Sequence, residues 1–404
     1  MSTRNTQFFL RIALFALALA ASTGALLRYG LIHGMPAWAA NFTAVRHAHS
    51  HLMYFGWVTL AIMTLIWREL PRLTGRPAPQ WVSRQMAATA IVALLSFPAF
   101  WANGYGLTQI GGAQLPLGSM ISTLNGLTWI WFIALYVKNT SGLATRPLAV
   151  QLWDWALVLL VVASTGAVGL AGLVMSGHPN IFLQQTFLHL FLDLFAVGWF
   201  TLAVLGLLWS QIGIESLPKW LPTQSLAIAL APTFILGIAS TMMTDRLFWP
   251  AALANLVAAG LLTVHLSALW QRRTHLPALF PFAAAALAVH ILIAFTLILP
   301  GVWRWGSGTQ LRIFFLHNLL LGWTSTALLG LIWAGFGWQK SGHRWLGAGW
   351  MVGVGGMLLA LLGVGFLQYL PISAQLLFQI AYWSSVTVAG ATVIQLFLRI
   401  EGTK

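Results

Sequence analysis

The sequence predicts an all-α polytopic membrane protein with about 12 transmembrane helices arranged as three pseudo-repeats of four. Three observations support this fold class. The 404 residues are 59% hydrophobic and only 6% charged, with a mean hydropathy of +0.83, whereas about a quarter of the residues in soluble domains are charged. About a dozen apolar runs are long enough to cross a hydrocarbon core of roughly 30 Å. Related strings of residues also recur along the chain at fixed offsets.

The expected helices are the apolar runs between polar or helix-breaking residues, taken in order along the chain. The apolar part of the first run, from Ile12 to Leu27, follows Arg4 and Arg11, precedes Arg28, and is slightly longer than the core of a signal peptide. We therefore expect it to be a retained span. With boundaries accurate to several residues, the spans are 10–28, 45–67, 85–105, 118–137, 149–174, 181–209, 225–243, 247–270, 277–300, 311–335, 346–369 and 373–398.

The positive charges are distributed unequally between the two sides of this arrangement. Of the 20 Lys and Arg residues, the side opposite the termini has only Arg28, Arg46, Arg246, Arg304 and Arg312. The positive-inside rule therefore predicts that both termini are cytoplasmic, in a bacterial-type inner membrane. Because this topology accounts for the net charge of +14, we expect a lipid partner and no nucleic-acid partner.

Internal repetition groups the helices into three units. The string A-S-T-G-A at 21–25 recurs at 163–167, and the same offset of 142 residues aligns the second helix with the sixth. A further offset of 124 aligns the sixth helix with the tenth, and five of twelve positions are identical in all three copies. The copies begin at Gly56, Gly198 and Gly322 and end at Trp67, Trp209 and Trp333. The pseudo-repeats span approximately 1–145, 146–272 and 273–404 of a single transmembrane domain.

Histidines within the predicted spans are the candidate metal ligands, because the chain has no cysteine and ionisable groups at membrane depth mark function. The repeat aligns His51 with Asp193 and His317. It also aligns Arg46 with Arg312, about one turn nearer the outer surface. Two imidazoles at one depth can ligate a haem iron axially, and the two arginines are suited to neutralise its propionates. The alternative for the two histidines is helix–helix hydrogen bonding, worth only about 1 kcal/mol in membranes.

Other polar residues at a similar depth predict a second site for copper, iron or another haem. His47 and His51 share a helix face, whereas His49 points nearly the opposite way, so one haem cannot use all three. The second-site candidates are His47, His49, His189, His290 and Asp193. Asp193 follows His189 by one helical turn and is suited to orient an imidazole or relay a proton. Alternatively, these residues are hydrogen-bonding partners or line a polar cavity.

Three further predictions concern residues near the cytoplasmic ends of the spans. Asp154 is the only other carboxylate that falls within a predicted span, and we expect it to be interfacial. His265 is expected to be structural or part of a proton path. The tryptophans that end the three aligned segments are interpreted as an aromatic belt at the membrane interface.

This pattern of helices and histidines resembles subunit I of the haem-copper oxidase superfamily and its NnrS-like relatives. In that superfamily, histidines of the second and tenth helices hold a low-spin haem, and they match His51 and His317. A sixth-helix histidine that binds copper is matched by His189. The run H-A-H-S-H at 47–51 is similar to the H-A-H-E-M segment of NnrS-like proteins, which bind haem and copper and are associated with nitric oxide metabolism.

The sequence departs from the oxidase pattern at three points. The tenth-helix H-x-H reads Phe315-Leu316-His317, and the predicted seventh helix has no histidine. The sixth-helix H-x-x-x-Y reads His189 to Asp193, so no tyrosine is available there. The resemblance therefore does not extend to a conventional oxygen-reducing or NO-reducing binuclear centre.

The resemblance implies a membrane b-type haem protein that acts in electron transfer, or in binding and detoxifying a diatomic gas such as nitric oxide. Its expected cofactors are haem b and either copper or a second haem. Quinol or a separate electron-donor protein would supply electrons. Two other functions stay open, namely a proton-coupled secondary transporter and an active oxygen or NO reductase with atypical ligands.

Overall fold

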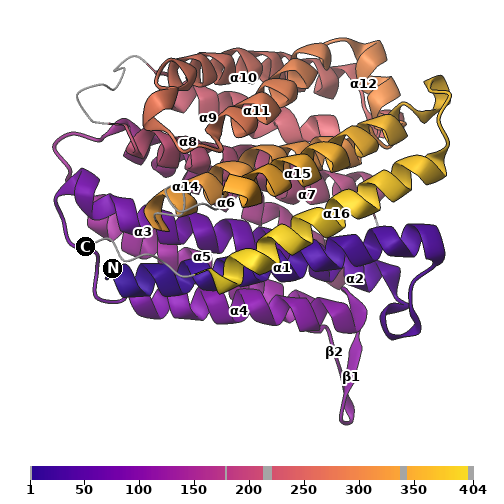
Figure 1. Cartoon of the computed structure of the whole chain (residues 1–404), viewed down its shortest axis with the longest axis horizontal. Coiled ribbons are helices and arrows are strands. Elements are labelled where there is room, and N and C mark those ends of the chain that lie inside the picture. Colours follow the sequence, from indigo (N-terminus) through magenta and orange to yellow (C-terminus); the bar gives the residue numbers. More distant parts are fainter. Residues whose placement is uncertain (1, 178–179, 213–220, 337–343, 399–404) are drawn as a thin grey trace. The chain divides into compact units, whose positions relative to one another are not determined.

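The computed structural model describes residues 2–177, 180–212, 221–336 and 344–398 (Figure 1). The strands among these residues are β1 (Thr108–Ile110) and β2 (Ala113–Leu115), which form an antiparallel hairpin. Nearly all other elements are helical. The chain divides into two compact units, one made of residues 1–144 and 332–404 and the other of residues 145–331.

The first unit is built from long apolar helices. It contains α1 (Thr3–His33), η1 (Ala37–Ala39), α2 (Phe42–His51), η2 (Leu52–Thr59), α3 (Leu60–Thr74), α4 (Val82–Asn103), α5 (Leu117–Thr140), α15 (Arg344–Gly365), η9 (Leu367–Tyr369) and α16 (Ala374–Phe397). The C-terminal helix α16 packs against both α1 and α15, so the two ends of the chain belong to the same unit (Figure 1).

The second unit contains α6 (Leu148–Ser176), α7 (Ile181–Leu194), η3 (Phe195–Phe200), α8 (Thr201–Ser210), α9 (Gln224–Leu230), η5 (Ala231–Gly237), η6 (Ser240–Met242), α10 (Asp245–Gln271), η7 (Arg273–His275), α11 (Phe280–Thr296), α12 (Pro300–Ser307), α13 (Leu311–His317) and η8 (Asn318–Ser325). The chain passes between the units twice, once between residues 144 and 145 and once within α14 (Thr326–Phe336). Helix α7 packs against α6 and η5, and α11 packs against η8.

The described helices confirm an all-α membrane fold, whereas the count of 12 spans is not confirmed. Within the described ranges, ten helices are long and apolar enough to cross a membrane, or eleven if α11 and α12, which are bent by 117°, form one span. The predicted span 225–243 contains only a short apolar helix over 224–237. Its α-helical part ends at Leu230, and Pro232 lies at the start of the 3-10 turn that follows. Proline cannot donate the backbone hydrogen bond that would continue the α-helix.

Three helices share an unusual interruption. The π segments η2 and η8 begin immediately after His51 and His317, and η3 begins two residues after Asp193. These are the positions that the sequence repeat aligns. π turns are rare and occur frequently at functional sites. Their positions therefore mark the part of each helix around His51, Asp193 and His317 as a candidate functional site. The boundaries of the three pseudo-repeats stay a prediction.

The aligned Gly-Trp segments are buried inside the protein. A Cβ atom on Gly56 would lie 3.0 Å from Cβ of Ala16, and one on Gly198 would lie 2.8 Å from Cδ1 of Leu159. Glycine therefore allows close helix packing at these positions. The aromatic-belt prediction is wrong, because belt residues face the membrane interface. Instead, the three tryptophans that end the segments are buried, namely Trp67, Trp209 and Trp333.

Candidate functional site

His51, the last residue of α2, has both ring nitrogens engaged. Its Nδ1 lies 2.9 Å from the carbonyl oxygen of His47, one turn earlier. Its Nε2 lies 2.8 Å from the hydroxyl of Tyr105. Because a carbonyl only accepts, we assign the ring proton to Nδ1, and Nε2 then accepts from the phenol. The buried ring stacks on Phe100, with the two centroids 3.6 Å apart.

His317 has the same local geometry at the end of α13. Its Nδ1 lies 2.7 Å from the carbonyl oxygen of Ile313, again one turn earlier. The proton is therefore assigned to Nδ1, and the lone pair to Nε2. Among the seven described histidines of the predicted spans, only His51 and His317 have Nδ1 bonded to the carbonyl four residues earlier. Metal-ligating histidines usually donate the second ring nitrogen in this manner.

The other polar residues of α2 take different directions. His49 Nδ1 lies 2.8 Å from the carbonyl oxygen of Ala20 on α1, which confirms that His49 points away from the His51 side. The His47 ring lies edge-on to Tyr105, with the centroids 5.0 Å apart. Arg46 is exposed, so its charge is available to an anionic group near this end of the helix.

A compact ion-pair network in the second unit joins Arg312 of α13 to α7. Arg312 Nη2 lies 2.8 Å from Oδ1 and 3.1 Å from Oδ2 of Asp193. His189 Nδ1 lies 2.9 Å from Asp193 Oδ2 and 2.8 Å from Arg312 Nη2. We infer that His189 Nδ1 carries a proton and donates it to the Asp193 carboxylate, because the carboxylate is the strongest acceptor present. Arg312, which the sequence predicted as a propionate partner, is therefore already paired with a carboxylate.

A close backbone approach completes this network. A Cβ atom on Gly237 of η5 would overlap both the Asp193 carboxylate and the His189 ring. Gln185 Oε1 accepts from the backbone amide of Ala239, 2.9 Å away, and so ties α7 to the segment that follows η5. The absence of a side chain at Gly237 lets this segment cover the buried His–Asp pair.

His290 on α11 is buried and lacks the orienting bond seen at His51 and His317. Its Nδ1 has no hydrogen-bond partner, and its ring packs on Phe315 with the centroids 4.7 Å apart. The carbonyl of Ala286, four residues earlier, instead accepts from Asn318 Nδ2 at 2.9 Å. Nowhere in the described ranges do three or more His, Cys, Asp or Glu side chains form a group that could hold a metal ion. A second metal site stays a prediction.

His265 is held by two hydrogen bonds. Its Nδ1 accepts from Trp209 Nε1 at 3.3 Å, and its Nε2 donates to the carbonyl of Pro222 at 2.9 Å. Both nitrogens of this buried ring are satisfied, which supports the structural alternative for His265. Asp154 forms an ion pair with Arg146, and its side chain is 30% exposed, as expected for an interfacial residue.

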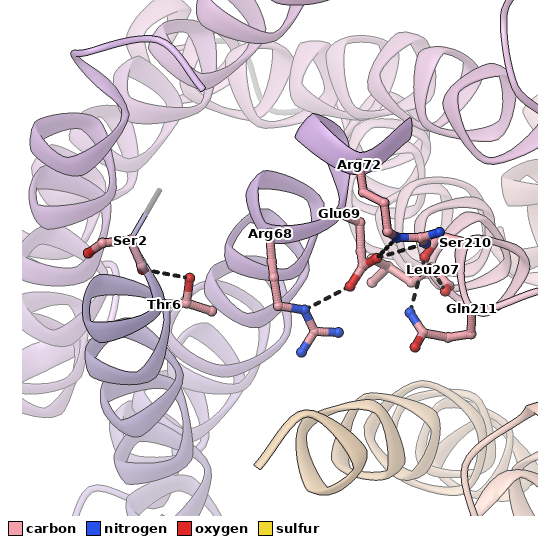
Figure 2. A network of polar contacts seen from close by, with 8 residues as sticks. All are labelled: Ser2, Thr6, Arg68, Glu69, Arg72, Leu207, Ser210 and Gln211. Carbon is pink, nitrogen blue, oxygen red and sulfur yellow. Dashed lines mark hydrogen bonds and ion pairs between the residues drawn. The ribbon is translucent and has the colours of Figure 1, made fainter. Parts of the chain in front are cut away.

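Glu69 is a buried carboxylate that the span assignment missed. Glu69 accepts from Arg68 Nε at 2.8 Å and from Arg72 Nη2 at 2.9 Å (Figure 2). The predicted span ended at residue 67, whereas α3 continues to Thr74 and ends at Gly75, whose φ is +68°. The run of charged residues after Trp67 looked like a loop, but here the arginines neutralise a carboxylate on the helix itself.

His51 and His317, each taken within its own unit, present the kind of single donor that a haem iron uses rather than the cluster of ligands that a bare metal ion needs. A protein-only metal centre needs about three or four protein ligands, whereas a porphyrin supplies the equatorial nitrogens and needs only axial donors. The tautomer of each histidine is fixed by a backbone carbonyl, which places the lone pair on Nε2, and at His51 this lone pair accepts the hydrogen bond of Tyr105. The nearby exposed cation of Arg46 suits a haem carboxylate.

Comparison with solved structures supports the all-α membrane fold described above. No family model matches the chain, and no curated protein does. A solved structure of a haem-copper terminal oxidase dimer is similar to it, with a TM-score of 0.70 and 12% sequence identity, covering 100% of this chain and 86% of the oxidase chain. At this identity the likeness concerns the fold. The protein is a helical, multi-pass membrane protein with the fold of a haem-copper terminal oxidase.

Proposed function

We propose that this protein is a membrane b-type haem protein in which His51 and His317 are the axial ligands of a low-spin haem. The observation that carries the proposal is the Nδ1–H to carbonyl bond that these two histidines share. This bond orients each ring and leaves the lone pair on Nε2, the nitrogen that would bind iron. Haem, when bound, supplies one-electron redox chemistry.

The surrounding residues have distinct roles in this proposal. Arg46 is exposed and would pair with a haem carboxylate. Arg312 neutralises Asp193 instead, because Nη2 lies 2.8 Å from Oδ1. The buried His189–Asp193 pair, with Nδ1 and Oδ2 2.9 Å apart, can hold a proton within the membrane-spanning part of α7.

Two axial histidines leave no open position on an iron atom, so this site favours electron transfer from quinol or a separate electron-donor protein. Binding and detoxifying a diatomic gas such as nitric oxide would need a second haem or copper. His189 and His290 are the candidates for that second site, because the former is oriented by a carboxylate and the latter has an unpartnered buried nitrogen.

Substitution of the proposed ligands tests the function. His51→Ala and His317→Ala should each abolish the low-spin haem spectrum of the purified protein, because one axial bond is lost. His33→Ala is the matched control, because His33 is exposed at the end of α1, and its spectrum should equal that of the wild type. Wild-type spectra in both ligand variants would refute the assignment.

A further inference from the structure

Tyr105 forms a hydrogen bond with Nε2 of His51, the nitrogen that would ligate iron. It follows α4, and its hydroxyl donates to His51 Nε2 across 2.8 Å. The Tyr105 ring meets His47 and Phe100 edge-on, with the centroids 5.0 Å apart in each case. The residue is 51% exposed. Because Nε2 of His51 carries no proton in the assigned tautomer, the phenol is the donor of this hydrogen bond.

The backbone beneath Tyr105 is fixed by a tight turn. Asn103 Nδ2 donates to the carbonyl of Leu107 at 2.7 Å, and the amide of Gly106 donates to the carbonyl of Asn103 at 2.9 Å. Gly104 has a φ of +57°, and a Cβ atom there would lie 3.2 Å from Cδ2 of His47. Glycine is therefore required where the chain leaves α4. Because the ring is half exposed, it can rotate outward while this turn is kept.

We infer that Tyr105 is a displaceable cap on the ligating nitrogen of His51. This inference rests on the proposed function, because a single Nε2 lone pair can serve either the phenol or an iron atom. If His51 were to ligate iron, Nε2 would first have to give up the hydrogen bond from the phenol. The phenol keeps its proton and donates to water, and no electron is transferred. Haem uptake at His51 is thus coupled to outward rotation of Tyr105.

The hydroxyl of Tyr105 should compete with haem for His51. Tyr105→Phe keeps the ring contacts with His47 and Phe100 but removes the competing donor. Haemin should therefore bind the variant about 2- to 10-fold more tightly, which corresponds to the net contribution of one hydrogen bond. Tyr369→Phe is the control, because Tyr369 lies in η9 of the same unit and is 64% exposed, and its affinity for haemin should be unchanged.

The experiment titrates the haem-depleted, full-length protein with haemin in detergent, following the optical spectrum. The same samples are treated with tetranitromethane, and nitration of each tyrosine is measured by mass spectrometry. Haemin should increase nitration of Tyr105 several-fold, because the released, outward-turned phenol is more accessible to the reagent, and it should leave Tyr369 unchanged.

The outcomes separate the cap from the haem site. The haem site stands if haemin gives a low-spin spectrum. The role of Tyr105 as a cap is then refuted if Tyr105→Phe binds haemin no more tightly than the wild type, or if haemin leaves the nitration of Tyr105 unchanged. If neither the wild type nor Tyr105→Phe gives a low-spin spectrum, the proposed haem site fails, and the cap fails with it.

Discussion

Replacing Arg312 with leucine tests whether the main partner of this arginine is Asp193. In the wild type the Arg312 Nη2 atom contacts both carboxylate oxygens, at 2.8 and 3.1 Å. Arg312→Leu leaves the Asp193 carboxylate with only the His189 N–H. An unpaired carboxylate at membrane depth costs about 3 kcal/mol, so the haem-depleted protein should become less stable.

The expected size of the effect follows from the exposure of the two side chains. Breaking a buried ion pair by removing one partner costs roughly 3–5 kcal/mol. The side chain of Asp193 is only 11% exposed, but that of Arg312 is 38% exposed, so solvent screening reduces the loss. We expect Arg312→Leu to lower the free energy of unfolding by about 2–3 kcal/mol.

A double-mutant cycle separates the ion pair from other effects. Asp193→Leu combined with Arg312→Leu removes both charges, so the double variant should lose about 1–3 kcal/mol less than the sum of the two single variants. Unfolding of haem-depleted protein in mixed micelles is followed by the fluorescence of its 22 tryptophans. Additive losses, or an Arg312→Leu variant as stable as the wild type, would refute the pairing and return Arg312 to the haem propionates.

Two further predictions concern the packing around the histidines. Gly237→Ala should lower the free energy of unfolding by about 1–3 kcal/mol, because its Cβ would overlap Asp193 and His189. Gly260 lies in α10, and a Cβ atom there would have no neighbour within 4 Å. Gly260→Ala should therefore raise the free energy of unfolding by up to about 1 kcal/mol. Equal thermal shifts for the two glycine variants would contradict this prediction. His265→Ala should destabilise the protein by about 2–4 kcal/mol, because Trp209 and Pro222 lose their partner. Its haem content per folded chain should stay unchanged, and loss of haem would instead assign His265 to the site.

Hydropathy predicted where most helices lie because each long apolar run must satisfy its backbone hydrogen bonds within the membrane. It did not predict where such a run stops being an α-helix. The residues after Leu230 are still apolar, yet they continue in a 3-10 turn that contains Pro232. The π segments after His51 and His317 were also missed, because apolar composition alone does not distinguish an i+5 turn from an i+4 turn.

The sequence selected candidate site residues but predicted only some of the contacts that the structure shows for them. The repeat selected His51, His317 and Asp193, because equivalent helices place equivalent residues at similar depth. Contacts between helices have no such rule, so the pairing of Arg312 with Asp193 was missed. The bond from Tyr105 to His51 was missed for the same reason, because a loop tyrosine gives no periodic signal.

The most direct test of the central claim is the optical spectrum of the purified wild-type protein, oxidised and dithionite-reduced, together with extraction of haem and elemental analysis for iron and copper. A low-spin haem held by His51 and His317 predicts a sharp α-band on reduction and at least one extractable b-type haem per chain. Protein that is folded and monodisperse but contains neither haem nor iron would contradict the claim and favour a transporter.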